Sequence, residues 1–186
     1  MTITELAILP LKPPHTVHTP RVEELFQMIQ KRQSDWSSYP VLYFSDEAGT
    51  TIYLLSGWES VAAHQELMKS DGNQEMLGLF QEYIDLEKLK LRHLDIPFEK
   101  EGKLVEAEFL GYAIQTEGGE VEVGEGHTWK AGGKDLEEEA GSGTHHIAAY
   151  SQAPVDGPGH AVKLHKRVYH HARNFGSTLD KDIPSI

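Results

Sequence analysis

The chain has 186 residues, of which 39% are hydrophobic and 25% charged, a composition that excludes a disordered protein. Its net charge of −12 repels phosphate backbones, so we expect no nucleic-acid partner. It has no cysteine, which excludes disulfides, thiolate metal sites and cysteine nucleophiles. No apolar run approaches the roughly 20 residues that span a bilayer, and no signal peptide is evident. We therefore expect no membrane partner and a cytoplasmic location.

The chain opens with an apolar segment at residues 2–11, which predicts a first strand that ends before Pro13-Pro14. Thr19-Pro20 then supplies a hydroxyl cap and a proline for the first helical position. A helix is predicted from there to Pro40, because apolar side chains recur at helical spacing. These side chains are Val22, Leu25, Phe26, Ile29 and Trp36.

Two further apolar runs form a predicted hairpin. Val41–Ser45 and Thr50–Ser56 read as strands, and Asp46–Gly49 between them has the composition of a tight turn. Gly57 is predicted to end the second strand, and Ser60 to cap the helix that follows.

The segment after this hairpin predicts two helices and a fourth strand. The first helix carries His64 on its apolar face, and the second begins near Asp71, where Asp71 and Gln74 have capping-box spacing. Leu89–Ile96 alternates apolar and polar residues, as a strand does. The order strand–helix–strand–strand–helix–strand predicts an α+β, ferredoxin-like module over residues 1–98. One face of its sheet would need cover from another sheet or a partner.

Residues 99–186 predict a degenerate second copy of this module. We expect strands at 103–115 and 144–151, an acidic glycine-rich loop through Gly126, and a C-terminal helix at about 160–175. Glu139-Ala-Gly-Ser142 precedes a strand much as Glu47-Ala-Gly-Thr50 does. The two sheets are expected to pack face to face. The protein would then be a pseudo-dimeric monomer, or a homodimer formed through another surface.

The segment Tyr53–Ser70 resembles the dimeric α/β-barrel superfamily, specifically antibiotic biosynthesis monooxygenase-like (ABM) domains. The resemblance lies in Trp58-Glu59-Ser60, in Ala63-His64 and in the closing Ser70. Leu89–Ile96 also looks like the last strand of related fungal proteins. The resemblance covers roughly residues 2–98, and the remainder only through the inferred second copy.

The resemblance implies a small-molecule ligand but leaves the activity open, because the superfamily hosts many reactions. One hypothesis is an enzyme of secondary or catabolic metabolism, such as a cofactor-independent monooxygenase or a cyclase acting on a phenolic or polyketide-like substrate. The other is a non-catalytic ligand-binding or stress-type barrel. A haem-binding protein is a third option, which would need a histidine facing an open cleft.

Two histidines are the candidate catalytic residues. His64 would point from its helix toward the sheet, where the resemblance places the substrate pocket, and would act as a general base or hydrogen-bond donor. Alternatively, His64 would be a packed histidine that orients the helix and has no catalytic role. His93 would project either into the same pocket or into the contact between the sheets.

Four aromatic residues are candidates for substrate binding. Trp58 would stack on a planar substrate, or else fill the end of the core. Tyr43, Tyr53 and Tyr83 would supply phenol donors, or else serve as core aromatics with one polar tip.

Seven of the eleven histidines fall between His127 and His171, which raises the question of a metal site. Their spacing matches no common metal motif, and His145-His146 would point to opposite faces of a strand. We therefore expect no metal and a solvated or pH-responsive histidine face. Without a dinucleotide-binding motif, a P-loop or a Gly-x-Ser-x-Gly motif, no cofactor is expected.

Overall fold

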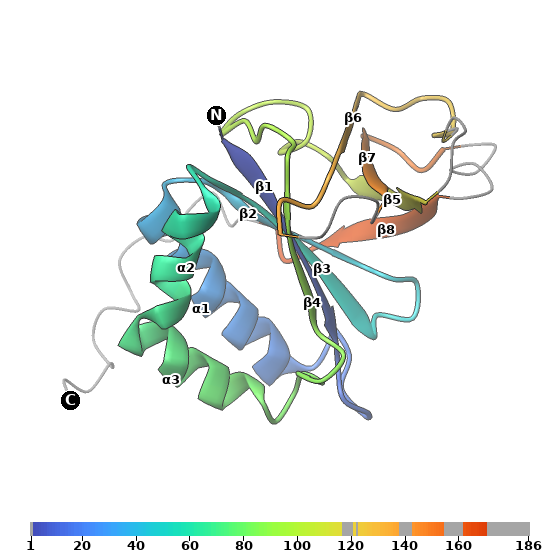
Figure 1. The fold of residues 1–186 in the computed structure, drawn as a ribbon. Helices are drawn as coiled ribbons and strands as arrows, with labels where there is room; N and C mark the ends of the chain where they lie inside the picture. Colours follow the sequence, from blue (N-terminus) through green and yellow to red (C-terminus); the bar gives the residue numbers. More distant parts are fainter. Residues whose placement is uncertain (1, 117–120, 122, 138–142, 155–161, 171–186) are drawn as a thin grey trace.

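The computed structural model describes residues 2–116, 121, 123–137, 143–154 and 162–170, which form one antiparallel sheet and three helices. The eight described strands follow the order β4-β1-β3-β2-β8-β5-β7-β6 across the sheet. Figure 1 shows the three helices together on one side of β1–β4, away from β5–β8.

The first half of the chain has the predicted types and order of elements. They are β1 (Ile3–Pro10), α1 (Pro20–Ser37), β2 (Val41–Ser45), β3 (Thr51–Trp58), α2 (Val61–Lys69), α3 (Asp71–Phe80) and β4 (Lys90–Leu94). The second half contributes β5 (Phe109–Gln115), β6 (Trp129–Gly133), β7 (Thr144–Tyr150) and β8 (Lys163–Val168).

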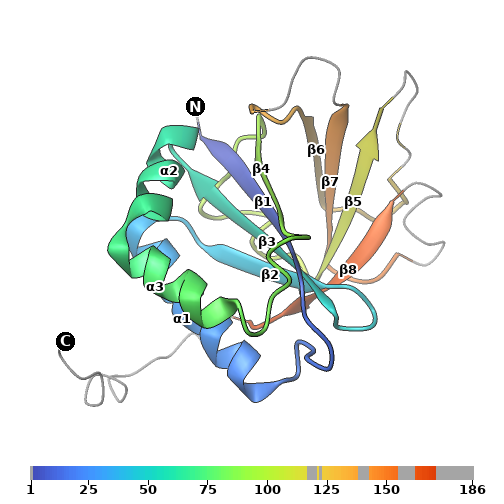
Figure 2. The ribbon, with the colours of Figure 1, turned by 60° about the horizontal axis from the view of Figure 1, so that its bottom comes forward.

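The two halves join into one sheet rather than forming two. Tyr43 of β2 pairs with Val168 of β8, so the halves meet edge to edge. At the opposite edges Leu94 and Asp135 form a bridge that nearly closes the sheet on itself, as the curl in Figure 2 indicates. The expected face-to-face packing of two separate sheets is therefore wrong. The faces meet because a single sheet curls around its own interior.

The curl gives the sheet an enclosed face and a helical face, each with its own core. The core of the enclosed face combines side chains of both halves, including Leu6, Leu42, Leu110 and Ile147. Alternate residues of β1, β2 and β3 in the first half point to the helices and form the other core. The apolar face that needed a cover is thus covered by the second half of the chain.

Serine caps begin α2 and α3, whereas the hydroxyl cap predicted at Thr19 is wrong, because Thr19 makes no side-chain cap hydrogen bond to α1. Ser60 begins α2, and its hydroxyl accepts a hydrogen bond from the backbone N–H of Ala63 at 3.2 Å. Ser70 caps α3 and accepts from the N–H of Asn73 at 3.3 Å. The capping box predicted at Asp71 and Gln74 is wrong, because the preceding serine holds the cap position.

Gly57 does not end β3, contrary to prediction, and the strand continues to Trp58. A Cβ at Gly57 would lie 2.5 Å from the ring of Tyr39 and 2.7 Å from that of Phe98. The glycine therefore serves close packing of these two rings against the strand rather than chain termination.

Two predictions for the second half are corrected. The helix expected at about 160–175 is wrong, because Lys163–Val168 forms the strand β8. The remaining ends of the expected helix, residues 160, 161 and 171–175, lie outside the described part of the chain. Pairing with β2 on one side and β5 on the other outweighs the helical spacing of a few apolar residues. Strand β6, Trp129–Gly133, was not predicted, because its two glycines weaken the strand pattern.

Candidate functional site

A buried carboxyl group lies at the centre of the candidate site. Glu5 of β1 points to the helical face and is only 3% exposed. Its Oε2 accepts hydrogen bonds from the indole Nε1 of Trp58 at 2.7 Å and from Nε2 of Gln33 at 2.5 Å. Burial raises the pKa of Glu5 to about 7, although the bond from Trp58 opposes this shift. Near neutral pH this carboxyl group therefore exists in both protonation states.

His64 points from α2 toward the sheet, as predicted, and is buried. Its ring stacks on Trp58, with ring centroids 4.4 Å apart and planes inclined by 18°. Its Nδ1 lies 2.8 Å from Nε2 of His93, and its Nε2 lies 3.7 Å from Oε1 of Glu5. Burial, with the adjacent His93, lowers the pKa of His64 to about 3. The imidazole is thus neutral at neutral pH.

His93 of β4 is fully buried and connects the site to the surface. Its Nδ1 contacts Oε2 of Glu137, whose side chain is 44% exposed. Asp135 positions this glutamate: its Oδ1 accepts from the backbone N–H groups of His93 and Glu137, and its Oδ2 accepts from Arg92 at 2.8 Å. The closure of the sheet thereby brings a surface carboxylate to a buried histidine.

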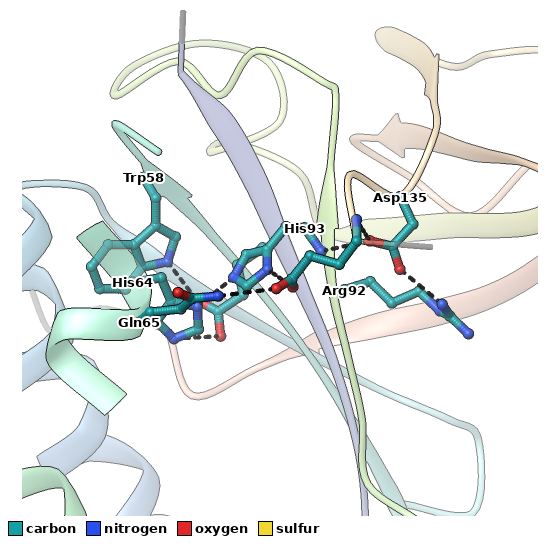
Figure 3. A network of polar contacts seen from close by, with 8 residues as sticks. Trp58, His64, Gln65, Arg92, His93 and Asp135 are labelled. Atoms are coloured by element: carbon teal, nitrogen blue, oxygen red, sulfur yellow. Dashed lines mark hydrogen bonds and ion pairs between the residues drawn. The ribbon is translucent and has the colours of Figure 1, made fainter. Parts of the chain in front are cut away.

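Three of the six predicted site residues meet in this network, namely His64, His93 and Trp58 (Figure 3). The tyrosines do not join them. Tyr43 is buried on the helical face and donates to the carbonyl of Phe26, whereas Tyr53 packs on the enclosed face. Tyr83 lies against the ring of His15.

Four residues of the network were not predicted from the sequence, namely Glu5, Gln33, Asp135 and Glu137. One signal was available for Glu5, because an acidic residue in a strand predicted to be buried requires a partner. Nothing comparable marked the other three, since their roles depend on contacts with residues far along the chain.

Among the described histidines of the second half, two are not solvated, contrary to the expectation of a solvated face. His145 and His165 are buried at 1% and 3% exposure. Nδ1 of His145 lies 2.9 Å from the hydroxyl of Tyr112, and His165 stacks on Tyr53 with centroids 3.7 Å apart. Burial lowers the pKa of His165 to about 4. Among the described residues, no group of three or more His, Asp or Glu side chains is arranged to hold a metal ion.

A cleft of about 780 Å³ lies elsewhere, between the start of α1, the β2–β3 turn and the end of β8. Its lining includes apolar and aromatic side chains, such as Phe109 and Tyr169, together with Lys166 and Arg167. His18 and His170 also line it, but His64, His93 and Trp58 do not. The two predicted catalytic histidines are instead hydrogen-bonded within packed protein.

Comparison with known proteins supports the fold. No family model matches the chain, and no curated protein matches it. The structure is similar to that of a candidate monooxygenase from Fusobacterium nucleatum subsp. nucleatum, with a TM-score of 0.57 and 10% identity over 89% of this chain and 91% of that one. A candidate monooxygenase from Lactobacillus acidophilus NCFM gives a TM-score of 0.49 and 12% identity, over 90% and 93%. At 10% identity, the first likeness shows a shared fold alone.

No described helix is long and apolar enough to cross a membrane.

Proposed function

We propose that this protein is a small-molecule enzyme that transfers a proton at the His64–His93 pair. The observation that carries the proposal is the direct 2.8 Å contact between two buried imidazoles, one of which stacks on Trp58. A neutral imidazole has a lone pair that can accept a proton, and Trp58 offers an aromatic surface to a planar substrate. The proposed substrate is a phenolic or polyketide-like compound.

The proposed reaction is that of a cofactor-independent monooxygenase or a cyclase. Deprotonation of an electron-rich phenol yields an anion that reduces O2 directly, and the same base would serve a cyclisation. The likeness in fold to a candidate monooxygenase supports this choice. So do Trp58-Glu59-Ser60 and Ala63-His64, which resemble ABM domains.

Substrate entry would require α2 to move, because the histidines lie in packed protein. This helix is held by a small separate core of Ile3, Trp58 and Leu67. Opening it would expose less apolar surface than opening either of the two larger cores, so α2 is the proposed lid.

The strand order supports the proposed ferredoxin-like modules, residues 1–98 and 99–186. The first half runs β4-β1-β3-β2 across the sheet, and the second runs β8-β5-β7-β6, which is the same order with four added to each number. We propose a degenerate internal repeat and hence a pseudo-dimeric monomer in the cytoplasm.

The test is a screen of phenolic and anthrone-type compounds that follows O2 uptake and product mass. His64→Ala should lower turnover at least 100-fold, because general-base catalysis contributes about 10²–10⁴-fold. His127→Ala, which changes a histidine outside the network, is the matched control. Turnover that survives His64→Ala in a folded protein would contradict the role of this residue.

A non-catalytic ligand-binding barrel is the second candidate, and the 780 Å³ cleft favours it. The same compound panel tests it by two-dimensional NMR. Shifts confined to Tyr169, His170 and their neighbours, without turnover, would support this candidate. A Soret band on addition of haemin, lost in His18→Ala or His170→Ala, would indicate haem binding in the cleft.

A further inference from the structure

The two histidines belong to a longer series of titratable groups. It begins at Glu5, passes through His64 and His93, and ends at Glu137. The side chains of the first three are 4%, 6% and 0% exposed, whereas that of Glu137 is 44% exposed. The series thus connects a carboxyl group in the core with one in contact with water.

The hydrogen bonds of Glu5 determine where its proton lies. Oε2 already accepts two N–H groups, from Trp58 and Gln33, so it has little capacity to carry a proton. The proton of the neutral acid therefore resides on Oε1, the oxygen that faces Nε2 of His64.

A proton on Oε1 of Glu5 determines which ring nitrogens of His64 and His93 carry hydrogen. With Nε2 of His64 facing an O–H, its Nδ1 carries the hydrogen and donates to Nε2 of His93. Nδ1 of His93 then carries the hydrogen that faces the carboxylate of Glu137. Every donor in this state points from the core toward the surface.

We propose that these four residues form a proton relay between the core and the solvent, with Glu5 as its inner terminus and Glu137 as its port. In one transfer the Oε1–H bond of Glu5 breaks and an N–H bond forms at Nε2 of His64. The Nδ1–H bond of His64 breaks as one forms at Nε2 of His93, and the Nδ1–H bond of His93 breaks as one forms on Glu137. Glu137 then releases its proton to water. The net change is one proton lost from Glu5.

Both imidazoles are neutral before and after this transfer, and only the terminal carboxyl groups change charge. That agrees with burial, which opposes the imidazolium form of His64. Other polar groups that face the series include Gln33 of α1, Trp58 of β3 and Gln65 of α2, together with the Arg92–Asp135 ion pair beside the port. Ser56 of β3 is buried and pairs with Glu5 across the sheet, and burial, with the charge of Glu5, raises the pKa of Tyr43 in β2. Arg92 and Asp135 are positioning residues, since they fix Glu137 against His93.

The contact of 3.7 Å between Glu5 and His64 is the longest in the series. A proton transfer there requires approach to hydrogen-bond distance, about 3 Å. In the proposed reaction, the relay would remove the proton that the histidine pair takes from a substrate enclosed beneath α2. This role in removing a substrate proton rests on the proposed function, whereas the arrangement of the four residues does not.

The test measures proton movement in the whole 186-residue chain without substrate. After a rapid pH jump, time-resolved infrared spectroscopy follows the protonated carboxyl band of Glu5, which Glu5→Gln identifies by removing it. Glu137→Gln keeps a hydrogen-bond acceptor beside His93 but cannot take up a proton. We expect Glu137→Gln to slow the loss of the proton from Glu5 at least tenfold.

Glu66→Gln is the matched control, because it neutralises an exposed carboxylate on α2 that lies outside the series. It should leave the rate unchanged. His64→Phe, which keeps a ring against Trp58, should slow the change as strongly as Glu137→Gln. If His64→Phe does not fold, Glu137→Gln alone decides.

Equal rates in the wild type and Glu137→Gln would overturn the relay, even if the phenolic screen finds turnover. A slowed rate in Glu137→Gln with no turnover of any phenol would support the relay and count against the proposed reaction. The two proposals therefore fail separately.

Discussion

Glu5 is an acidic side chain buried between the sheet and the helices, where most of the neighbouring side chains are apolar. Its pKa is raised to about 7 from an ordinary value of 4.5, chiefly by burial. The folded protein therefore holds this proton over a pH range in which the unfolded chain has lost it. The stability contributed by the neutral acid is full below pH 4.5 and is lost as pH rises through 7.

Glu5→Gln should remove this dependence while keeping a side chain of the same shape. Relative to the variant, the wild type should lose on the order of 3 kcal/mol of unfolding free energy between pH 4.5 and 8. The lowered pKa of His64 has the opposite effect on stability: the stability that neutral His64 contributes is lost as pH falls from 6.5 through 3. This contribution is the same in the wild type and in Glu5→Gln, so it cancels in the comparison. Urea unfolding at a series of pH values measures the difference. If the difference in unfolding free energy between the wild type and Glu5→Gln does not vary with pH between 4.5 and 8, the raised pKa of Glu5 is contradicted.

Trp58→Phe should raise the pKa of Glu5 above about 7, because the indole N–H stabilises the carboxylate. The carboxyl resonance of Glu5, followed by carbon-13 NMR during a pH titration, measures the shift. Trp129→Phe is the control, since that tryptophan packs on the enclosed face. A midpoint that is unchanged or lower in Trp58→Phe would contradict the assigned hydrogen bond.

At the scale of elements, β3 and α2 bring the site residues together. β3 delivers Trp58 at its last position, and Ser60 starts α2 so that His64 falls on the face toward the sheet. Gly57, the residue before Trp58 in β3, allows the rings of Tyr39 and Phe98 to approach the strand. The junction therefore needs a small residue for packing on the enclosed face.

Gly57→Ala should destabilise the protein by about 1–3 kcal/mol, because the added methyl group overlaps two buried rings. Gly78→Ala in α3 is the matched control. A Cβ there meets no atom within 4 Å, and alanine stabilises a helix by about 1 kcal/mol relative to glycine. Urea midpoints should thus move in opposite directions. A neutral Gly57→Ala would refute the packing role.

At the scale of the whole molecule, the second half covers a face that would otherwise be an exposed apolar surface. β2, which would be an edge strand of the first half, is paired with β8. Neither the apolar face nor the edge of β2 is therefore open to pair with a second chain.

We therefore expect this 186-residue chain to be monomeric. Size-exclusion chromatography with light scattering, at several concentrations, should give the mass of one chain throughout. A dimer that dissociates in Leu110→Asp or Ile147→Asp, which place charge on the enclosed face, would contradict the covering role of the second half.

The sequence by itself determined the elements of the first half, since their signals are local. Hairpin composition, helical apolar spacing and the serine cap act within a few residues, and they also placed His64 on the inner face of its helix. The tertiary structure alone decided that Lys163–Val168 is a strand, that the sheet nearly closes, and that Glu5 and Glu137 lie at the two ends of the histidine pair. Each of these depends on pairing between residues tens of positions apart. The free energy of such contacts arises only when the chain has folded, so no local pattern reports it.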